Sequence, residues 1–194
     1  MSNKIRANEL AFDIDGVFAD TFRIFVEIAR NEYGIKIEYE AITEYEFWKY
    51  MDFDADIFHK IIGRILDYPI EVGIMPINGA IEVLTRLVNL GPLLFVTARP
   101  EKDAILRWIL LHLKLEDMDA IRLESTGTHE EKLPVLMKYG VRYFIEDRLE
   151  TCYLLEQGSV VPIVFDQPWN RKPHPFKTVK NWDEVSDMIE WEKT

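Results

Sequence analysis

The feature that most constrains the fold of this chain is the alternation of short apolar segments with longer segments of helical spacing. Apolar segments of strand length occur at residues 10–12, 93–96, 121–123, 143–145 and 160–165. After Pro76, the residues between them place apolar side chains three and four positions apart, as amphipathic helices do. Strands that alternate with helices form a mostly parallel sheet covered on both faces. We therefore predict an α/β fold.

Residues 35–75 depart from this alternation. They contain no clear apolar strand, and Ile57, Ile61 and Ile65 form a stripe at helical spacing instead. The capping-box pattern at residues 43–46 indicates a further helix start in this segment. We expect a compact helical insert here, between the two parts of one α/β core. The predicted core comprises residues 1–34 and 76–194, and the insert comprises residues 35–75.

Polar side chains follow the predicted strands, at the point where each strand ends. Sheets of this kind bind ligands beyond the carboxyl ends of their strands. A capping-box pattern at residues 128–131 also predicts a helix start just before the last of these strand ends. The residues that these features place at one rim of the sheet are Asp13, Asp15, Thr97, Lys132, Glu146 and Asp147. The rim therefore combines several carboxylates with a hydroxyl and an ammonium group.

This combination of groups suits phosphoryl transfer. Clustered carboxylates repel one another unless protons or a cation intervene, and carboxylate oxygens are ligands that Mg²⁺ prefers. The Thr97 hydroxyl and the Ala98 N–H can donate to a phosphoryl group, and Lys132 can supply positive charge at a helix start. In the reaction that fits, Asp13 attacks phosphorus to form an aspartyl-phosphate. Asp15 protonates the leaving oxygen and then activates the water that hydrolyses the intermediate.

The same residues, in the same order along the chain, resemble the four motifs of the haloacid dehalogenase-like hydrolases. The motifs are residues 13–21, residues 95–100 with Thr97, the lone Lys132, and Glu146 with Asp147. The resemblance implies a Rossmann-like three-layer core with a small helical cap inserted after the first strand and helix. It implies Mg²⁺ bound by Asp13, by the backbone carbonyl of Asp15 and by Asp147. Glu146 is then a supporting acid beside the metal ligands. An exchange of roles between Glu146 and Asp147 stays open, as does a role for Glu150.

The acid at position 15 narrows the resemblance within the superfamily. Dehalogenases of the family lack an acid two residues after the nucleophile, so Asp15 favours a phosphatase or phosphomutase. Residues 13–17, 97–100 and 165–170 resemble the 5′-nucleotidase and deoxyribonucleotidase-like branch. This likeness implies a Mg²⁺-dependent phosphomonoesterase that acts on a nucleoside monophosphate. A phosphatase of a sugar phosphate or another small metabolite is the alternative.

Aromatic residues of the predicted cap are candidates for contact with a nucleobase. We take Phe18, which follows the first motif, and Trp48, in the cap, as the substrate-pocket residues. The competing interpretation is that a small helical cap needs these rings for its own packing. Arg171 and Lys172 follow the last predicted strand, so they either contact an anionic substrate or belong to a solvated loop.

Two other classes of protein place similar residues around an aspartate. A receiver-type signalling module also uses clustered acids, a Thr and a Lys around a phosphorylated Asp. In a receiver, however, the acceptor Asp lies on a middle strand, and no cap is inserted. A non-catalytic binding protein on the same fold is the third class, although all the motif positions are occupied here.

Composition limits the partners and the compartment. The formal net charge is −11, which argues against a nucleic-acid polymer or an anionic membrane as partner. A small phosphorylated metabolite remains compatible if a metal ion offsets the charge. Cys152 is the single cysteine, so no intramolecular disulfide forms, and we expect it to be a buried apolar side chain. We read the four histidines as structural or exposed. The polar N-terminal residues predict a cytosolic protein, and the oligomeric state stays open.

Overall fold

A six-stranded parallel sheet forms the centre of the computed structural model, which describes residues 4–50 and 53–191. The strands are β1 (Leu10–Phe12), β2 (Leu93–Thr97), β3 (Ile121–Ser125), β4 (Tyr143–Glu146), β5 (Val161–Phe165) and β6 (Lys177–Val179). Their order across the sheet is β3-β2-β1-β4-β5-β6, and every neighbouring pair is parallel. This arrangement confirms the predicted α/β fold. Strand β6 was not among the predicted strands, because Val179 is its one buried residue.

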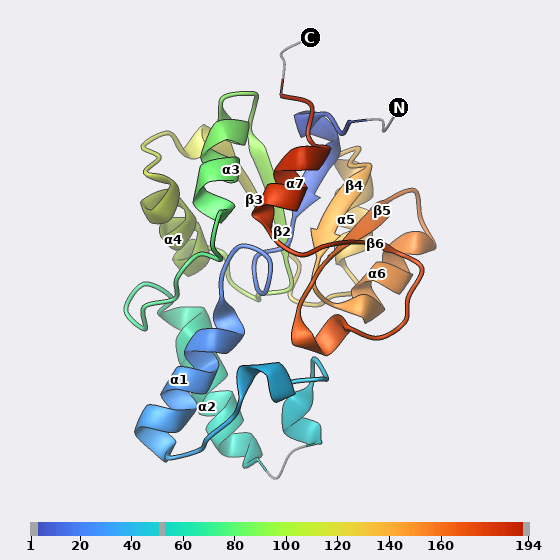
Figure 1. Ribbon diagram of the computed structural model, residues 1–194. Coiled ribbons are helices and arrows are strands. Elements are labelled where there is room, and N and C mark those ends of the chain that lie inside the picture. The colour runs from blue at the N-terminus through green and yellow to red at the C-terminus, as the bar shows by residue number, and fades with distance from the viewer. Residues whose placement is uncertain (1–3, 51–52, 192–194) are drawn as a thin grey trace.

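Helices cover both faces of the sheet, which gives three layers (Figure 1). The helices are α1 (Thr21–Tyr33), α2 (Ala55–Asp67), α3 (Ala80–Val88), α4 (Asp103–Leu113), α5 (Lys132–Lys138), α6 (Leu149–Glu156) and α7 (Trp182–Met188). On one face, Phe12 and Phe95 share a core cluster with residues of α3, α4 and α7. On the other face, Ala11 and Leu94 pack with residues of α5 and α6. The alternation of side chains along each strand thus supplies two cores, as expected for strands buried on both faces.

The cap lies beyond the carboxyl ends of the strands (Figure 1). The stripe predicted to form a helix does so in α2, where Ile61 and Ile65 are buried. Helix α1 packs against α2, so both stand together below the sheet. The predicted boundaries at residues 34 and 75 therefore stay a prediction, and α1 shares its packing with the insert. Phe25 of α1 contacts the rings of Phe47 and Phe58 at centroid distances of 5.4 and 5.3 Å.

The two capping-box patterns do not begin helices where they predicted them. Helix α5 begins at Lys132, and the residue before it makes no side-chain capping bond. The preceding residues form a turn instead, because the Thr126 hydroxyl donates to the carbonyls of Thr97 and Thr128. Residues 43–46 likewise precede only a short 3₁₀ turn, Phe47–Lys49. At residues 126–128, a local side-chain bond thus forms a turn just before the predicted helix start.

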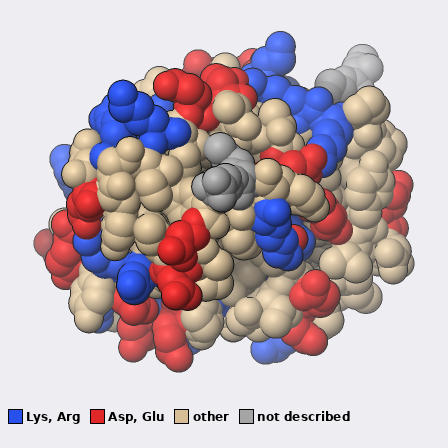
Figure 2. Space-filling view, turned by 90° about the horizontal axis from the view of Figure 1, so that it is seen from below, with Lys and Arg blue, Asp and Glu red and all other residues tan. Residues whose placement is uncertain are grey.

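The surface of the cap carries charges of both signs. Figure 2 shows Lys and Arg side chains interspersed with Asp and Glu on the side seen from below Figure 1. No helix in residues 4–50 and 53–191 combines the length and apolar character that crossing a membrane requires.

Candidate active site

Three buried carboxylates converge at the carboxyl ends of β1 and β4. Each of Asp13, Glu146 and Asp147 offers an oxygen that lies within 4.8 Å of the others. The register of the sheet brings the acids together. Phe12 pairs with Ile145, so the residues that follow them on the adjacent strands lie close to each other. The Asp13 N–H donates to the Ile145 carbonyl at 2.9 Å, which fixes the backbone at this point.

Lys132 lies between two of these acids. Its Nζ is 2.8 Å from Asp13 Oδ2 and 2.9 Å from Glu146 Oε2, and the side chain is completely buried. Burial opposes the charge of the ammonium, but the two carboxylates outweigh burial and raise the pKa of Lys132. One ammonium does not balance three carboxylates. Burial, followed by the charge of Glu146, therefore raises the pKa of Asp13 and of Asp147 well above the ordinary range.

Glu146 and Asp147 differ in their hydrogen-bond partners. Glu146 accepts from Lys132 through Oε2, and from the N–H groups of Asp147 and Arg148 through Oε1. Asp147 accepts from Trp169 Nε1 through Oδ2, but its Oδ1 is buried without a partner in the described part of the chain. A buried carboxylate oxygen without a donor is costly, and a hard divalent cation would remove that cost. These residues therefore fit a metal ion, with Asp147 and Asp13 as carboxylate ligands and Glu146 as support.

Gly16 makes room for the Asp147 carboxylate. A Cβ atom at position 16 would lie 2.1 Å from Asp147 Oδ2, and the φ of Gly16 is +75°. Both the close approach and the left-handed backbone require glycine. The turn after Asp15 thus lets the loop after β1 approach Asp147 closely.

Asp15 is held in a separate ion pair on the same rim. Arg99 donates to it from Nε to Oδ2 at 2.9 Å and from Nη2 to Oδ1 at 2.8 Å. The Thr21 hydroxyl donates to Oδ1 as well. Burial acts to raise the pKa of Asp15, but the charge and hydrogen bonds of Arg99 outweigh it, so the net pKa lies below the ordinary value. Asp15 is thus held as a carboxylate.

A pocket of about 160 Å³ joins these groups to the cap. Its polar part contains Asp13, Asp15, Thr97 and Ala98, which the sequence places at the rim. The remaining lining residues are Thr21, Phe22, Tyr45, Ile62, Leu66, Arg99, Pro100 and His129. The structure thus brings together the predicted nucleophile, acid–base residue and phosphate-binding residues, with Lys132 bonded to Asp13. Metal binding by the Asp15 carbonyl stays a prediction.

Several predicted contacts lie elsewhere. Phe18 is fully buried between Phe95 and Trp108 and does not line the pocket. Trp48 stacks on Phe58 at a centroid distance of 3.9 Å, and it too lies outside the pocket lining. Both rings take part in aromatic packing, and contact of either ring with a substrate stays a prediction.

Three charged residues whose roles could not be assigned from the sequence form ion pairs: Arg171, Lys172 and Glu150. Arg171 pairs with Glu40 of the cap, and Lys172 pairs with Glu44. Glu150 is 61% exposed and pairs with Arg148 at 3.5 Å, outside the cluster of acids. Cys152 is buried, as expected.

No sequence pattern marked the residues that form the far wall of the pocket. Tyr45 reaches from the cap toward the acids, and burial with the negative charge of Asp147 raises the pKa of its hydroxyl. His129 lines the pocket, although it was expected to be structural or exposed. Burial, then the charge of Lys132, lowers the pKa of His129 to about 4, so its imidazole is neutral at pH 7. No sequence pattern marked His129, three residues after Thr126, as a pocket residue, because its place depends on the turn before α5.

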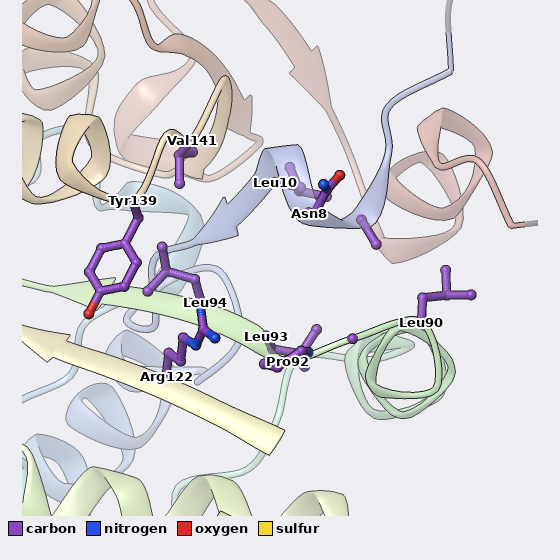
Figure 3. A pocket seen from close by; sticks show the side chains of 11 residues that line it. Asn8, Leu10, Leu90, Pro92, Leu93, Leu94, Arg122, Tyr139 and Val141 are labelled. Atoms are coloured by element: carbon purple, nitrogen blue, oxygen red, sulfur yellow. The ribbon is translucent and has the colours of Figure 1, made fainter. Parts of the chain in front are cut away.

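A second pocket lies at the opposite edge of the sheet, where strands begin (Figure 3). It measures about 140 Å³ and is mostly apolar, with Leu10, Leu94 and Val141 among its lining residues. Arg122 and Tyr139 reach it from the side, and the Tyr139 hydroxyl donates to Glu124. None of the clustered acids lines this pocket, so it is separate from the rim described above.

The sheet order, the cap and the groups at the strand ends define a haloacid dehalogenase-like hydrolase. Solved structures support the fold. The chain matches a Clostridium difficile protein at 18% identity and a TM-score of 0.60, covering 98% of this chain and 100% of that one. It matches a haloacid dehalogenase-like family hydrolase from Streptococcus pneumoniae at 12% identity and a TM-score of 0.61, covering 96% and 99%. It matches CbbY from Rhodobacter sphaeroides, solved in complex with phosphate, at 16% identity and a TM-score of 0.56, covering 91% and 95%.

The sequence identifies the branch. Residues 7–194 match the family described as 5′ nucleotidase, deoxy (pyrimidine), cytosolic type C protein, and the chain belongs to this family. No curated protein matches the chain. The resemblance stated from the motifs is therefore confirmed, and the chain is a hydrolase of the phosphatase type.

Proposed function

We propose that this protein is a Mg²⁺-dependent phosphomonoesterase that hydrolyses nucleoside monophosphates through an aspartyl-phosphate at Asp13. The observation that carries the proposal is the convergence of Asp13, Lys132 and the partnerless Oδ1 of Asp147 beside the hydroxyl of Thr97. Membership in a 5′-nucleotidase family supports the substrate class. The description of that family as cytosolic supports a cytosolic location.

The first half of the reaction forms the intermediate. Lys132 holds Oδ2 of Asp13, which leaves Oδ1 to attack phosphorus. Asp15, a carboxylate in the free protein, first takes up a proton from solvent. As the Asp13–phosphorus bond forms, the bond to the leaving oxygen breaks, and the Asp15 carboxyl group gives that oxygen its proton. The Thr97 hydroxyl and the Ala98 N–H donate to the oxygens of the transferring group, and Lys132 offsets its charge.

The second half returns the enzyme to its starting state. Asp15, now a carboxylate, takes a proton from water, whose oxygen attacks phosphorus and releases the Asp13 carboxylate with inorganic phosphate. Asp13 and Asp147 would hold Mg²⁺, together with the Asp15 carbonyl. When bound, the ion would offset the negative charge of the acids and of the phosphoryl group, so that the two can approach.

The wall of the pocket favours a neutral, ring-bearing leaving group. Phe22, Tyr45 and Leu66 supply apolar and aromatic surface, and His129 is neutral. Arg99 is the cation in the lining, and Asp15 already occupies two of its donors. A second anionic group on the substrate would thus find no free positive charge in the lining. A nucleoside meets these conditions better than a bisphosphorylated sugar, and a sugar monophosphate is the alternative.

A phosphate-release screen tests the proposal. Wild-type protein is incubated with nucleoside monophosphates and sugar phosphates, with Mg²⁺ and again with excess chelator, and Asp13→Asn serves as the matched control. We expect release from nucleoside monophosphates that requires Mg²⁺ and is restored when the ion is returned. Release without metal would overturn the metal-dependent mechanism, and faster release from sugar phosphates would overturn the substrate class. No release from any phosphoester would instead favour a receiver-like or non-catalytic binding role.

A further inference from the structure

Arg99 connects the active-site rim to the cap through one side chain. Two of its nitrogens donate to the Asp15 carboxylate, at 2.9 and 2.8 Å, while Nη1 donates to the carbonyl of Leu66 at 3.3 Å. We propose that Arg99 is a positioning residue, which ties the orientation of the Asp15 carboxylate to the position of cap helix α2. The proposal rests on the proposed function, because it assigns Asp15 the transfer of a proton at the leaving oxygen.

The geometry on the core side is that of a rigid fork. The Arg99 side chain is 2% exposed, and the Asp15 side chain is 18% exposed, so the pair is shielded from water. A guanidinium that donates through two parallel bonds fixes the plane of a carboxylate as well as its distance. Thr97 accepts from the Arg99 N–H through its hydroxyl oxygen at 3.2 Å, which anchors the base of the same loop. Asp15 therefore cannot rotate unless the guanidinium moves with it.

On the cap side, the guanidinium of Arg99 contacts the end of helix α2, so movement of α2 would move it. Leu66 lies in the last turn of α2, where helix carbonyls lack a partner within the helix. Arg99 supplies one of those missing donors from the core. A shift of α2 relative to the sheet changes the position of that carbonyl, and the planar guanidinium transmits the shift to Asp15. The cap contact and the orientation of the acid–base residue are thus set by the same group.

A purely structural role for Arg99 predicts something different. If the ion pair only stabilised the junction of core and cap, its loss would slow all substrates alike. If Arg99 acts through Asp15, its loss slows formation of the aspartyl-phosphate most for the substrate whose leaving group needs a proton. Release of a nucleoside requires protonation of its alkoxide, whereas p-nitrophenolate leaves without a proton. The ratio of rates on these two substrates therefore separates the two roles.

The first experiment compares Arg99→Met, Arg99→Lys and wild type on a nucleoside monophosphate and on p-nitrophenyl phosphate. We compare kcat/KM, because it reports the steps up to departure of the leaving group and not the later hydrolysis of the aspartyl-phosphate, which Asp15 serves for both substrates. For Arg99→Met we expect kcat/KM to fall roughly 100-fold on the nucleotide and less than about 10-fold on p-nitrophenyl phosphate. Arg99→Lys keeps the buried charge without the fork, so it should retain the unequal loss if Arg99→Met does not fold. The matched control is Arg64→Met, which removes an exposed arginine of the same cap helix that pairs with Glu32, and it should leave both rates unchanged.

The second experiment tests whether the effect passes through Asp15. In an Asp15→Asn background, Arg99→Met should change the ratio of rates by less than about twofold, because residues that act as one unit are not additive. Hydrogen exchange of the amides at residues 65–68 should be faster in Arg99→Met than in wild type, since α2 loses a donor at its end. Equal losses on both substrates, additive effects in the double variant, or unchanged exchange at α2 would each overturn the proposal. A wild-type protein that hydrolyses neither substrate would reject the proposed function itself, which is a different outcome.

Discussion

At the carboxyl ends of the strands, Asp13, Lys132 and Glu146 are ionisable and buried, whereas the cap faces the same pocket mainly with apolar and aromatic side chains. The two regions are held by different forces. The rim depends on buried ion pairs around Lys132, and loss of this ammonium group would leave two buried carboxylates without their shared partner. The cap depends on the packing of rings, together with exposed ion pairs to the core.

Substitutions in the two regions should therefore have different effects on stability and on activity. At the rim, burial and then the negative charge of Glu146 raise the pKa of Asp13 and of Asp147. Removing a carboxylate there should destroy activity without harming the fold, whereas removing the single ammonium should harm the fold. In the cap, substitutions should change stability or substrate binding, depending on which way the side chain points.

The largest expected effect is on the nucleophile. Asp13→Asn keeps the shape of the side chain but not its nucleophilic oxygen, so turnover should fall by more than about 1,000-fold. Because the change also removes one of the mutually repelling charges, the melting temperature should stay equal to that of wild type or rise. Phosphate release and thermal unfolding measure the two effects. An active Asp13→Asn protein would remove the aspartyl-phosphate from the mechanism.

The next largest effect is on the free energy of unfolding, through the ion pairs of the rim. Lys132→Met leaves Asp13 and Glu146 without their shared partner in a buried site, which we expect to cost about 3–5 kcal/mol of unfolding free energy. Urea unfolding in the absence of divalent cations measures this cost. The matched control is Lys138→Met, an exposed lysine of the same helix, which should change the unfolding free energy by less than about 0.5 kcal/mol. Equal costs for the two variants would show that the buried ion pairs contribute little.

The same contrast explains how much could be predicted from the sequence. A polar residue that directly follows an apolar strand of a parallel sheet has its position set by the strand, so Asp13, Thr97 and Asp147 could be placed at one rim. Asp147 could be preferred over Glu146 only through the resemblance, and the hydrogen bonds of the pair now give the physical reason. Strand β6 could not be predicted, because a short edge strand with one buried residue leaves almost no apolar pattern.

The far wall of the pocket could not be predicted for a different reason. Tyr45 and Trp48 are three residues apart in a segment rich in aromatic residues. The local sequence does not indicate which of the two side chains points toward the acids. Their directions are set by the turn Phe47–Lys49 and by Phe58, onto which Trp48 stacks. Arg99 shows the same limit, because the motif that contains it gives no sign of the distant helix end that it contacts.

Substitutions of these two aromatic residues sharpen the contrast within the cap. Tyr45→Ala removes a side chain that lines the pocket, so KM for a nucleoside monophosphate should rise about tenfold, or about 1.4 kcal/mol. Trp48→Ala removes a ring stacked on Phe58, so it should lower the unfolding free energy by about 2 kcal/mol and leave KM unchanged. Steady-state kinetics and urea unfolding of both variants give the comparison. A raised KM in Trp48→Ala would return that residue to the substrate pocket.

The smallest effect is expected for the exposed ion pairs between the cap and the loop after β5. Arg171 and Lys172 are each 48% exposed in their pairs with Glu40 and Glu44, and exposed pairs contribute little because water and salt screen them. Replacing both basic residues by Ala should lower the unfolding free energy by less than about 1 kcal/mol, and the difference should vanish in 1 M salt. Urea unfolding at low and high salt checks this, with Glu40→Ala and Glu44→Ala together as the reciprocal control. If the basic residues only bind the cap, KM should not change in either variant. A rise in KM confined to the variant that lacks Arg171 and Lys172 would instead show that these residues contact the anionic substrate.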